Sequence, residues 1–230
     1  MKKICVFLCA VCIIFGWRGY SSACCIGGGG PSALMDFEGL LDGEPLLNYY
    51  NGGLGGSGSG PGTNFGVVFS SNAIARIDAD AGGIGNFGGE PSPDTALIFE
   101  DGTSFTMNIN AGWEDAFSFW YSAPFPQMGV GFVSVYDGLD GTGSVLTSAT
   151  LPATPDTGAP DPNGNYSPFV YHEMLFSGIA RSVDFGGTAK FIGWDDIGFG
   201  SVASIPEPST LLLLGTGLLG VVGIARRRKG

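Results

Sequence analysis

Short apolar runs separated by glycine-rich turns fill the middle of this 230-residue chain. Between residues 116 and 122, Phe117, Phe119 and Tyr121 stand at every second position. Side chains of a β-strand point alternately to its two faces, so this spacing predicts a strand with one aromatic face. Comparable short runs occur at residues 64–70, 95–99, 104–109, 129–136, 145–151, 170–176, 181–185 and 190–199.

The connections between these runs contain residues that favour tight turns. Asp-Gly or Gly-Gly pairs occur at 101–102, 137–138, 140–141 and 186–187, and helical periodicity is hard to find in this region. About ten short strands without intervening helices predict an all-β fold, a β-sandwich with jelly-roll-like topology. Residues 51–62, 81–93 and 152–168 are rich in glycine, serine or proline and are predicted to be loops.

Composition supports a folded domain between Ala33 and Ser204. Glycine accounts for 41 of the 230 residues, a bias that by itself approaches that of disordered chains. The chain also holds 17 Phe, 7 Tyr and 4 Trp, which supply the apolar area that disordered chains lack. About 170 residues suffice for one domain with its own core.

The C-terminal segment combines three features in a fixed order. Pro206, Glu207 and Pro208 precede an apolar run from 211 to 225, and an arginine cluster follows at Arg226, Arg227 and Arg228. As a helix this run would span about 22 Å, which is short against about 30 Å of bilayer hydrocarbon. A basic cluster behind an apolar segment stays on the cytoplasmic side, so the segment is predicted to anchor the chain in the inner membrane with the main domain outside.

This order of triplet, apolar run and arginine cluster resembles the PEP-CTERM sorting signal of Gram-negative bacteria that make extracellular polysaccharide. The resemblance covers residues 205–230. It implies recognition and cleavage by the membrane enzyme exosortase, delivery to the cell envelope or extracellular matrix, and a link to exopolysaccharide or biofilm. An ordinary tail anchor is the alternative. Residues 133–146 and 194–199 also look like segments of other PEP-CTERM passenger domains.

The N-terminal segment predicts export as well. Lys2 and Lys3 precede an apolar run from 4 to 17, and small residues at 21–23 suit signal peptidase, so residues 1–23 are predicted to be a helical signal peptide. Cleavage there would expose Cys24, whose lipidation stays open because Ser21 replaces the usual aliphatic residue. Residues 24–33 are predicted to form a glycine-rich linker, and residues 34–204 the passenger domain.

Charge and cysteine content limit the partners and the means of stabilisation. Once both ends are removed, three basic residues, Arg76, Arg181 and Lys190, stand against twenty acidic ones, a formal charge of −17. Nucleic acid is therefore excluded as a partner, whereas divalent cations suit such a chain. Because no cysteine follows Cys25, a disulfide framework cannot stabilise the domain.

Carboxylates at the two ends of the domain form a candidate metal site. Asp36 and Glu38 lie two residues apart near its start, and therefore on one face of an expected strand, and Asp195 and Asp196 lie near its end. If the first and last strands pair, these side chains meet, and repulsion between them favours a bound cation. We therefore predict a structural calcium at Asp36, Glu38 and Asp196, an arrangement that resembles the site of many jelly-roll carbohydrate-binding modules. Solvated carboxylates at a sheet edge are the alternative.

Three functional classes follow. A non-enzymatic envelope or matrix protein without catalytic residues or other cofactors is the leading prediction. A calcium-stabilised carbohydrate-binding module is the alternative, in which an exposed Trp113 or Trp120 could stack on polysaccharide. A glycan-active hydrolase, in which the same carboxylates, Glu38 among them, act as one acid and one base or nucleophile, is a third. The lone His172 has no nearby serine or cysteine in a nucleophile motif.

Overall fold

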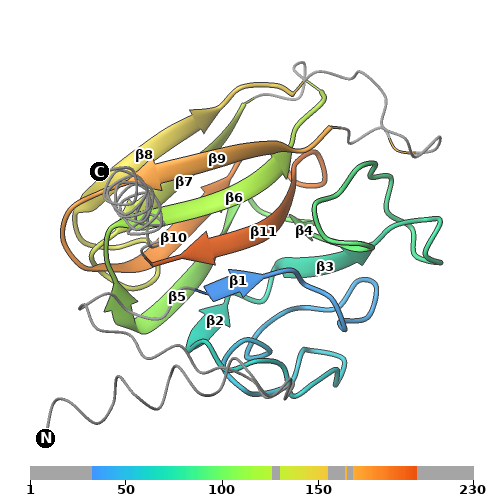
Figure 1. Ribbon diagram of the computed structural model, residues 1–230, viewed down its shortest axis with the longest axis horizontal. Coiled ribbons are helices and arrows are strands. Elements are labelled where there is room, and N and C mark those ends of the chain that lie inside the picture. The colour runs from blue at the N-terminus through green and yellow to red at the C-terminus, as the bar shows by residue number, and fades with distance from the viewer. Residues whose placement is uncertain (1–32, 126–129, 155–163, 165–167, 201–230) are drawn as a thin grey trace, which may run out of the picture.

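Two antiparallel β-sheets face each other across an aromatic core in the computed structural model (Figure 1). The structure describes residues 33–125, 130–154, 164 and 168–200. These residues contain eleven strands and no helix. The all-β prediction is therefore confirmed for the described part of the chain, and the helices expected at both ends lie outside it.

The first sheet contains six strands in the order β3-β4-β11-β6-β9, and β1 also pairs with β11. The bounds are β1 (Ala33–Met35), β3 (Ala73–Ile77), β4 (Thr95–Phe99), β6 (Ala116–Ser122), β9 (Val170–Leu175) and β11 (Gly193–Phe199). The second sheet has the order β2-β5-β10-β7-β8. Its strands are β2 (Val67–Phe69), β5 (Ser104–Trp113), β7 (Gly131–Tyr136), β8 (Val145–Leu151) and β10 (Ala180–Gly186).

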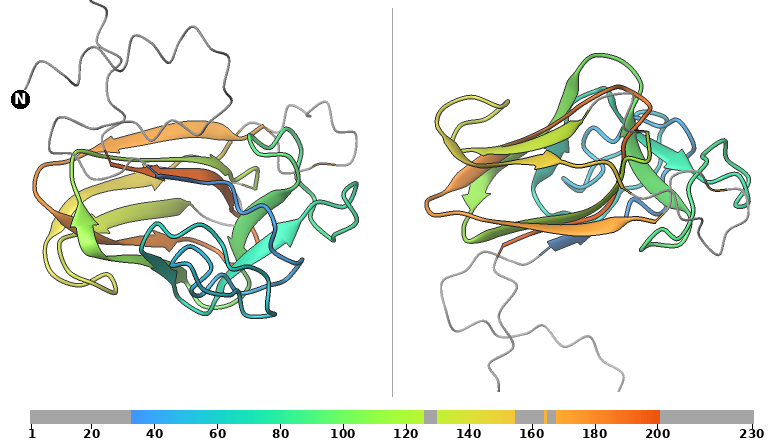
Figure 2. Two further views of the ribbon diagram at one scale, coloured as in Figure 1. Left: turned by 60° about the horizontal axis from the view of Figure 1, so that its bottom comes forward. Right: turned by 90° about the horizontal axis from the view of Figure 1, so that it is seen from above.

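Strands β4 to β11 form a jelly roll. Within the first sheet they take the order 4-11-6-9, and within the second the order 5-10-7-8, so the chain crosses between the sheets at almost every connection. This is the double-sheet arrangement of a jelly roll. Figure 2 shows the two layers edge-on in its right view. In the described residues, no helix is long and apolar enough to cross a membrane.

Aromatic side chains from both sheets fill the space between the layers. The rings of Phe105 and Phe185 stack with centroids 4.7 Å apart, and Trp194 meets Phe105 edge-on at 5.2 Å. Phe117 and Phe119 are fully buried on the face that their alternation predicted. Burial of this much ring surface supplies the stabilisation that disulfides provide in other exported domains.

A β-bulge interrupts β11 where its neighbour changes from β4 to β1. Trp194 pairs with β4, whereas residues 197–199 pair with β1. Asp196 lies between them with φ of 46°, in the left-handed region, and the register with β6 shifts at this point. Strict alternation would place Ile197 on the face of Asp195, but the extra residue turns Ile197 into the core with Trp194.

Two strands and one local conformation differ from the expectations. The short β3 was not predicted, because two alanines and Arg76 make its apolar run less distinct. The opening strand, expected around Asp36 and Glu38, is β1 and lies before them. The face-sharing predicted for Asp36 and Glu38 is wrong, because β1 ends at Met35 and Phe37 has φ of 61°. Phe37 is instead buried, and its backbone N–H donates to the Tyr50 hydroxyl at 2.7 Å.

Candidate functional site

The first and last strands do bring Asp36 and Asp196 together. β1 and β11 are antiparallel, with Ala33 opposite Phe199 and Met35 opposite Ile197, so the next position along places Asp36 beside Asp196. Burial raises the pKa of Asp196, and repulsion from the Asp36 carboxylate raises it further. These two carboxylates therefore lie close enough for their charges to interact, and whether they hold a cation stays a prediction.

The side chain of Glu38, the third predicted ligand, forms its hydrogen bonds with the start of β4 and not with this pair. Its Oε1 accepts hydrogen bonds from the backbone N–H groups of Asp94 and Thr95, at 3.0 and 2.9 Å, and its Oε2 accepts from the Thr95 hydroxyl at 3.2 Å. Glu38 thus fixes the start of β4. Within the described residues, no three histidine, cysteine or carboxylate side chains converge as a metal-binding group. Two carboxylates alone supply few of the six to eight oxygens that calcium takes.

Asp195 is a buried acid that occupies the outer side of the same bulge. Its oxygens accept the backbone N–H groups of Ser92 and Asp196, at 3.0 and 2.7 Å. Burial raises the pKa of Asp195 to about 8, against the hydrogen bonds from Ser92, which lower it. Ser92 Oγ lies 2.8 Å from Asp195 Oδ1 and 2.9 Å from the carbonyl oxygen of Asp36. A serine hydroxyl has one hydrogen, so a protonated Asp195 can donate to Ser92 while Ser92 donates to Asp36.

The outer side of the first sheet carries a pair of aromatic residues. Trp120 on β6 and Tyr171 on β9 are directly opposed, with ring centroids 5.5 Å apart. Tyr171 is 46% exposed and Trp120 is half-buried. Ser118 and Glu173 form the next opposed pair on this side. We call these four residues the aromatic face.

Of the two tryptophans considered for sugar stacking, Trp113 lies in the core. Its side chain is buried, and its indole N–H donates to the carbonyl of Ala116 at 3.1 Å. Trp120 stays accessible. His172 is half-buried on β9 and packs against Phe119, with ring centroids 5.5 Å apart.

The same sheet side carries a second hydrophobic cluster and a pocket beside it. Ile74, Phe87, Ala96, Ile98 and Phe169 form this cluster, and Trp120 packs against it. Phe87 comes from the long loop after β3, which was predicted to be a loop, and covers β11 near Gly193. The outer side of the first sheet is therefore covered by this loop over one half, next to β3 and β4, and carries the aromatic face on the other.

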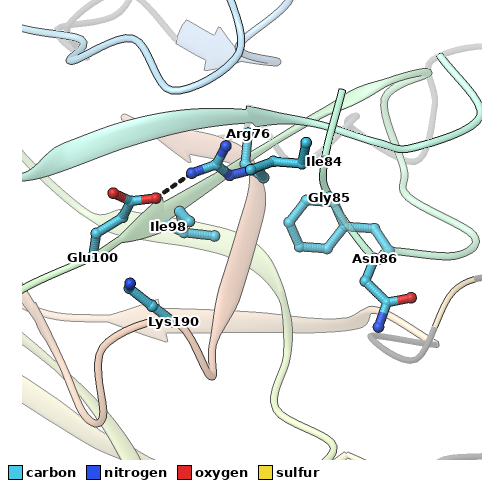
Figure 3. A pocket seen from close by; sticks show the side chains of 8 residues that line it. Arg76, Ile84, Gly85, Asn86, Ile98, Glu100 and Lys190 are labelled. Carbon is cyan, nitrogen blue, oxygen red and sulfur yellow. Dashed lines mark hydrogen bonds and ion pairs between the residues drawn. The ribbon is translucent and has the colours of Figure 1, made fainter. Parts of the chain in front are cut away.

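The pocket opens between this loop and the ends of β3 and β4 (Figure 3). Its volume is about 370 Å³. The lining combines apolar walls with two cations, a carboxylate and an amide: Arg76, Ile84, Gly85, Asn86, Phe87, Ile98, Glu100 and Lys190. Arg76 is held in place by Asp42, whose two carboxylate oxygens accept from its Nη1 at 3.0 and 3.1 Å, and by an ion pair with Glu100. Sequence patterns could not reveal this pocket, because its residues come from four separate segments.

Fold and site define an all-β, jelly-roll-like passenger. The tail defines its route, because residues 204–229 match the family description "PEP-CTERM protein-sorting motif". The predicted motif residues Pro206, Glu207, Pro208 and Arg226 to Arg228 fall inside this match and outside the described residues. The predicted resemblance is confirmed, and the chain is an exported protein of the cell envelope that carries an exosortase sorting signal. The signal peptide, the linker and Cys24 also lie outside the described residues.

Solved structures similar to this chain include adhesin and carbohydrate-binding domains. The K2 cleaved adhesin domain of Lys-gingipain aligns with 10% identity and a TM-score of 0.46, over 74% of this chain and 99% of that domain. A carbohydrate-binding module from Cellvibrio mixtus lichenase 5A aligns with 14% identity and a TM-score of 0.32, over 57% of this chain and 88% of that module. The family 11 carbohydrate-binding module from Clostridium thermocellum aligns with 11% identity and a TM-score of 0.32, over 73% of this chain and 94% of that module.

At these scores the neighbours carry no functional argument, and the fold assignment rests on the two sheets themselves. A comparison with curated proteins found no match.

Proposed function

We propose that this protein is a non-enzymatic component of the envelope or extracellular matrix of a Gram-negative bacterium, where it helps to organise exopolysaccharide or biofilm. The sorting motif at residues 204–229 carries this proposal. In it, signal peptidase removes the leader, the tail holds the chain transiently in the inner membrane, and exosortase acts near the Pro-Glu-Pro triplet. The folded domain is then presented outside the cell.

Mass spectrometry of the protein recovered from envelope and medium tests this route. The chain with Pro206, Glu207 and Pro208 replaced by alanine should keep its tail and stay in the membrane fraction. The unaltered chain should yield a product that ends near the triplet. An unaltered chain that retains residues 209–230 in the matrix would contradict the proposal.

The aromatic face supports contact with polysaccharide. Tyr171 is exposed beside Trp120, and aromatic rings pack against the apolar face of pyranose rings. Glu173 is exposed next to the rings and can accept hydrogen bonds from sugar hydroxyls, whereas Ser118 is buried. The two rings are tilted by 60° to each other, so each can contact a different sugar unit of one chain, and apolar surface with a few polar groups is typical of ligand sites.

Affinity electrophoresis in gels that contain the producing strain's own exopolysaccharide tests this contact. Trp120→Ala together with Tyr171→Ala should remove most of the retardation, whereas Tyr136→Ala, on the opposite sheet, should leave it unchanged. Equal retardation of all three proteins would remove the aromatic face from the proposal. Release of reducing sugar by the intact protein would favour the hydrolase alternative.

Calcium stabilisation is a second candidate property, and the juxtaposition of Asp36 and Asp196 favours it. A cation between the two carboxylates would relieve the repulsion that raises the pKa of Asp196. Of the predicted ligands, Glu38 accepts two hydrogen bonds at Oε1 and one at Oε2, so Oε2 keeps a lone pair that could bind the cation. Calorimetry in calcium and in chelator should show a higher melting temperature with calcium, and Asp36→Asn should abolish the difference. Identical melting in both buffers would end the calcium proposal.

A further inference from the structure

The pocket beside β3 and β4 gathers basic side chains in a domain that has few. The described residues contain three basic side chains, Arg76, Arg181 and Lys190, and two of them line this pocket. The rest of the domain is strongly acidic, so a negatively charged group would be repelled almost everywhere else on its surface. The pocket is therefore the place where an anionic group would be tolerated.

The arrangement of charges favours a ligand with one negative charge. Arg76 is nine-tenths buried and neutralised by Asp42 and Glu100, so it serves mainly as a fixed donor. The Lys190 ammonium has three hydrogens and can donate to a ligand in addition to its contacts within the protein. The charges of Arg76, Lys190, Asp42 and Glu100 sum to zero, so a ligand with a single negative charge meets less repulsion here than a dianionic phosphate would, and Lys190 can donate to it.

The remaining walls suit a sugar ring. Ile84, Phe87 and Ile98 offer apolar surface, Asn86 offers an amide, and Glu100 can accept hydrogen bonds from hydroxyls. Lys190 and Glu100 lie on one side of the pocket and Asn86 on the other (Figure 3). A volume of about 370 Å³ lies at the small end of ligand pockets, which admits one or two rings.

We propose that this pocket binds a hexuronic acid unit of an acidic polysaccharide. The carboxylate lies against Lys190, the hydroxyls reach Glu100 and Asn86, and the apolar ring face lies against Ile84. This inference rests on the proposed polysaccharide role and names the class of sugar. Strand β11 alone separates β4, which borders the pocket, from β6, which carries Trp120, and at about 4.8 Å per strand these two strands lie roughly 10 Å apart. A polysaccharide chain of several sugar units is long enough to contact both the pocket and the aromatic face.

Titration calorimetry of the full chain in mild detergent tests the pocket. The probes are a galacturonate trimer, a neutral galactose trimer and lactate, which has the carboxylate without the ring. The galacturonate trimer should bind at least tenfold more tightly than either of the others. Lys190→Met should lower its affinity about tenfold, whereas Arg181→Met, which removes the same charge on β10, should leave it unchanged. Equal losses in the two variants, or no preference for the acidic trimer, would overturn the proposal.

A second pair of variants protects the test against a folding defect. Ile84 is 75% exposed, so substitution there leaves the core intact. Ile84→Asp should weaken galacturonate binding about tenfold by repulsion, whereas Ile84→Asn, equal in size but neutral, should weaken it much less. Equal binding by the two variants would contradict a negatively charged ligand in this pocket.

The experiments distinguish failure of the proposed function from failure of the pocket proposal. If Trp120→Ala leaves binding of the producing strain's polysaccharide unchanged while Lys190→Met still weakens the galacturonate trimer, the aromatic face is wrong and the pocket stands. If Trp120→Ala loses polysaccharide binding while Lys190→Met has no effect on the trimer, the pocket is wrong and the aromatic face stands.

Discussion

Asp195 is an ionisable residue in a buried position that disfavours its charged form. Its side chain is fully buried, and burial raises its pKa to about 8. In the unfolded chain the same carboxyl has a pKa near 3.8. Between about pH 4 and pH 8 the folded state therefore keeps a proton on Asp195 that the unfolded state has released. The contribution of Asp195 to stability falls as the pH rises through this range.

We predict that Asp195→Asn changes the pH dependence of folding. In chelator, the free energy of unfolding from urea titrations should decline between pH 6 and 8 in the unaltered chain, by up to about 1.4 kcal/mol per pH unit from this group. Asp195→Asn should be less stable at pH 5, because its amide nitrogen must face a backbone N–H, but its stability should lack that decline. Parallel pH curves for the two proteins would show that Asp195 is ionised when folded.

At the scale of an element, Glu44 organises the glycine-rich loop of residues 51–62. Its Oε1 accepts the backbone N–H groups of Ser57 and Ser59, at 2.8 and 3.0 Å, and its Oε2 accepts that of Leu41 at 2.8 Å. A Cβ on Gly55 would lie 2.4 Å from Glu44 Oε1, so glycine is required there for the close approach. The loop is thus built around one buried carboxylate.

We predict that Glu44→Ala lowers the free energy of unfolding by about 3 kcal/mol, because three backbone donors lose a charged acceptor. Limited proteolysis should then cut within residues 51–62. Asp80→Ala removes an exposed carboxylate and should change stability by less than about 0.5 kcal/mol. A protease-resistant loop in Glu44→Ala would mean that Glu44 does not hold it.

Elements were predictable from sequence where alternation was long and bordered by turns. Residues 116–122 and 145–151 match β6 and β8 at both ends. The bulge at Asp196 was not predictable, because it depends on β1 and β4 sharing one side of β11, a long-range arrangement. The meeting of Asp36 with Asp196 followed from expecting the end strands to pair, whereas the turn of Glu38 toward β4 depends on the left-handed Phe37.

At the scale of the whole molecule, both sheets share one core. Phe105 and Phe185 come from the second sheet, Trp194 comes from the first, and the three rings contact one another. Unfolding of either sheet would expose the apolar inner face of the other, so the two should unfold together.

We predict one urea transition, with coincident midpoints by far-ultraviolet dichroism and tryptophan fluorescence. Phe185→Ala should shift both midpoints equally, with a loss of about 3–5 kcal/mol from the cavity it leaves. Leu175→Ala, at a 69% exposed position, is the control and should shift neither midpoint appreciably. Separate midpoints for the two signals would show that the sheets unfold independently.

The antiparallel pairing of β1 with β11 also determines how the domain would respond to mechanical force. Ala33 and Phe199 are opposed, so tension applied between these two points would open the ladder one pair at a time, beginning with that pair. Tension applied between Phe199 and Ser122 at the end of β6 would instead load the β6–β11 pairs from Gly193–Ser122 to Phe199–Phe117 together. A domain tethered by its C-terminal side and pulled through β6, which carries Trp120, would therefore resist more than one pulled by its two ends.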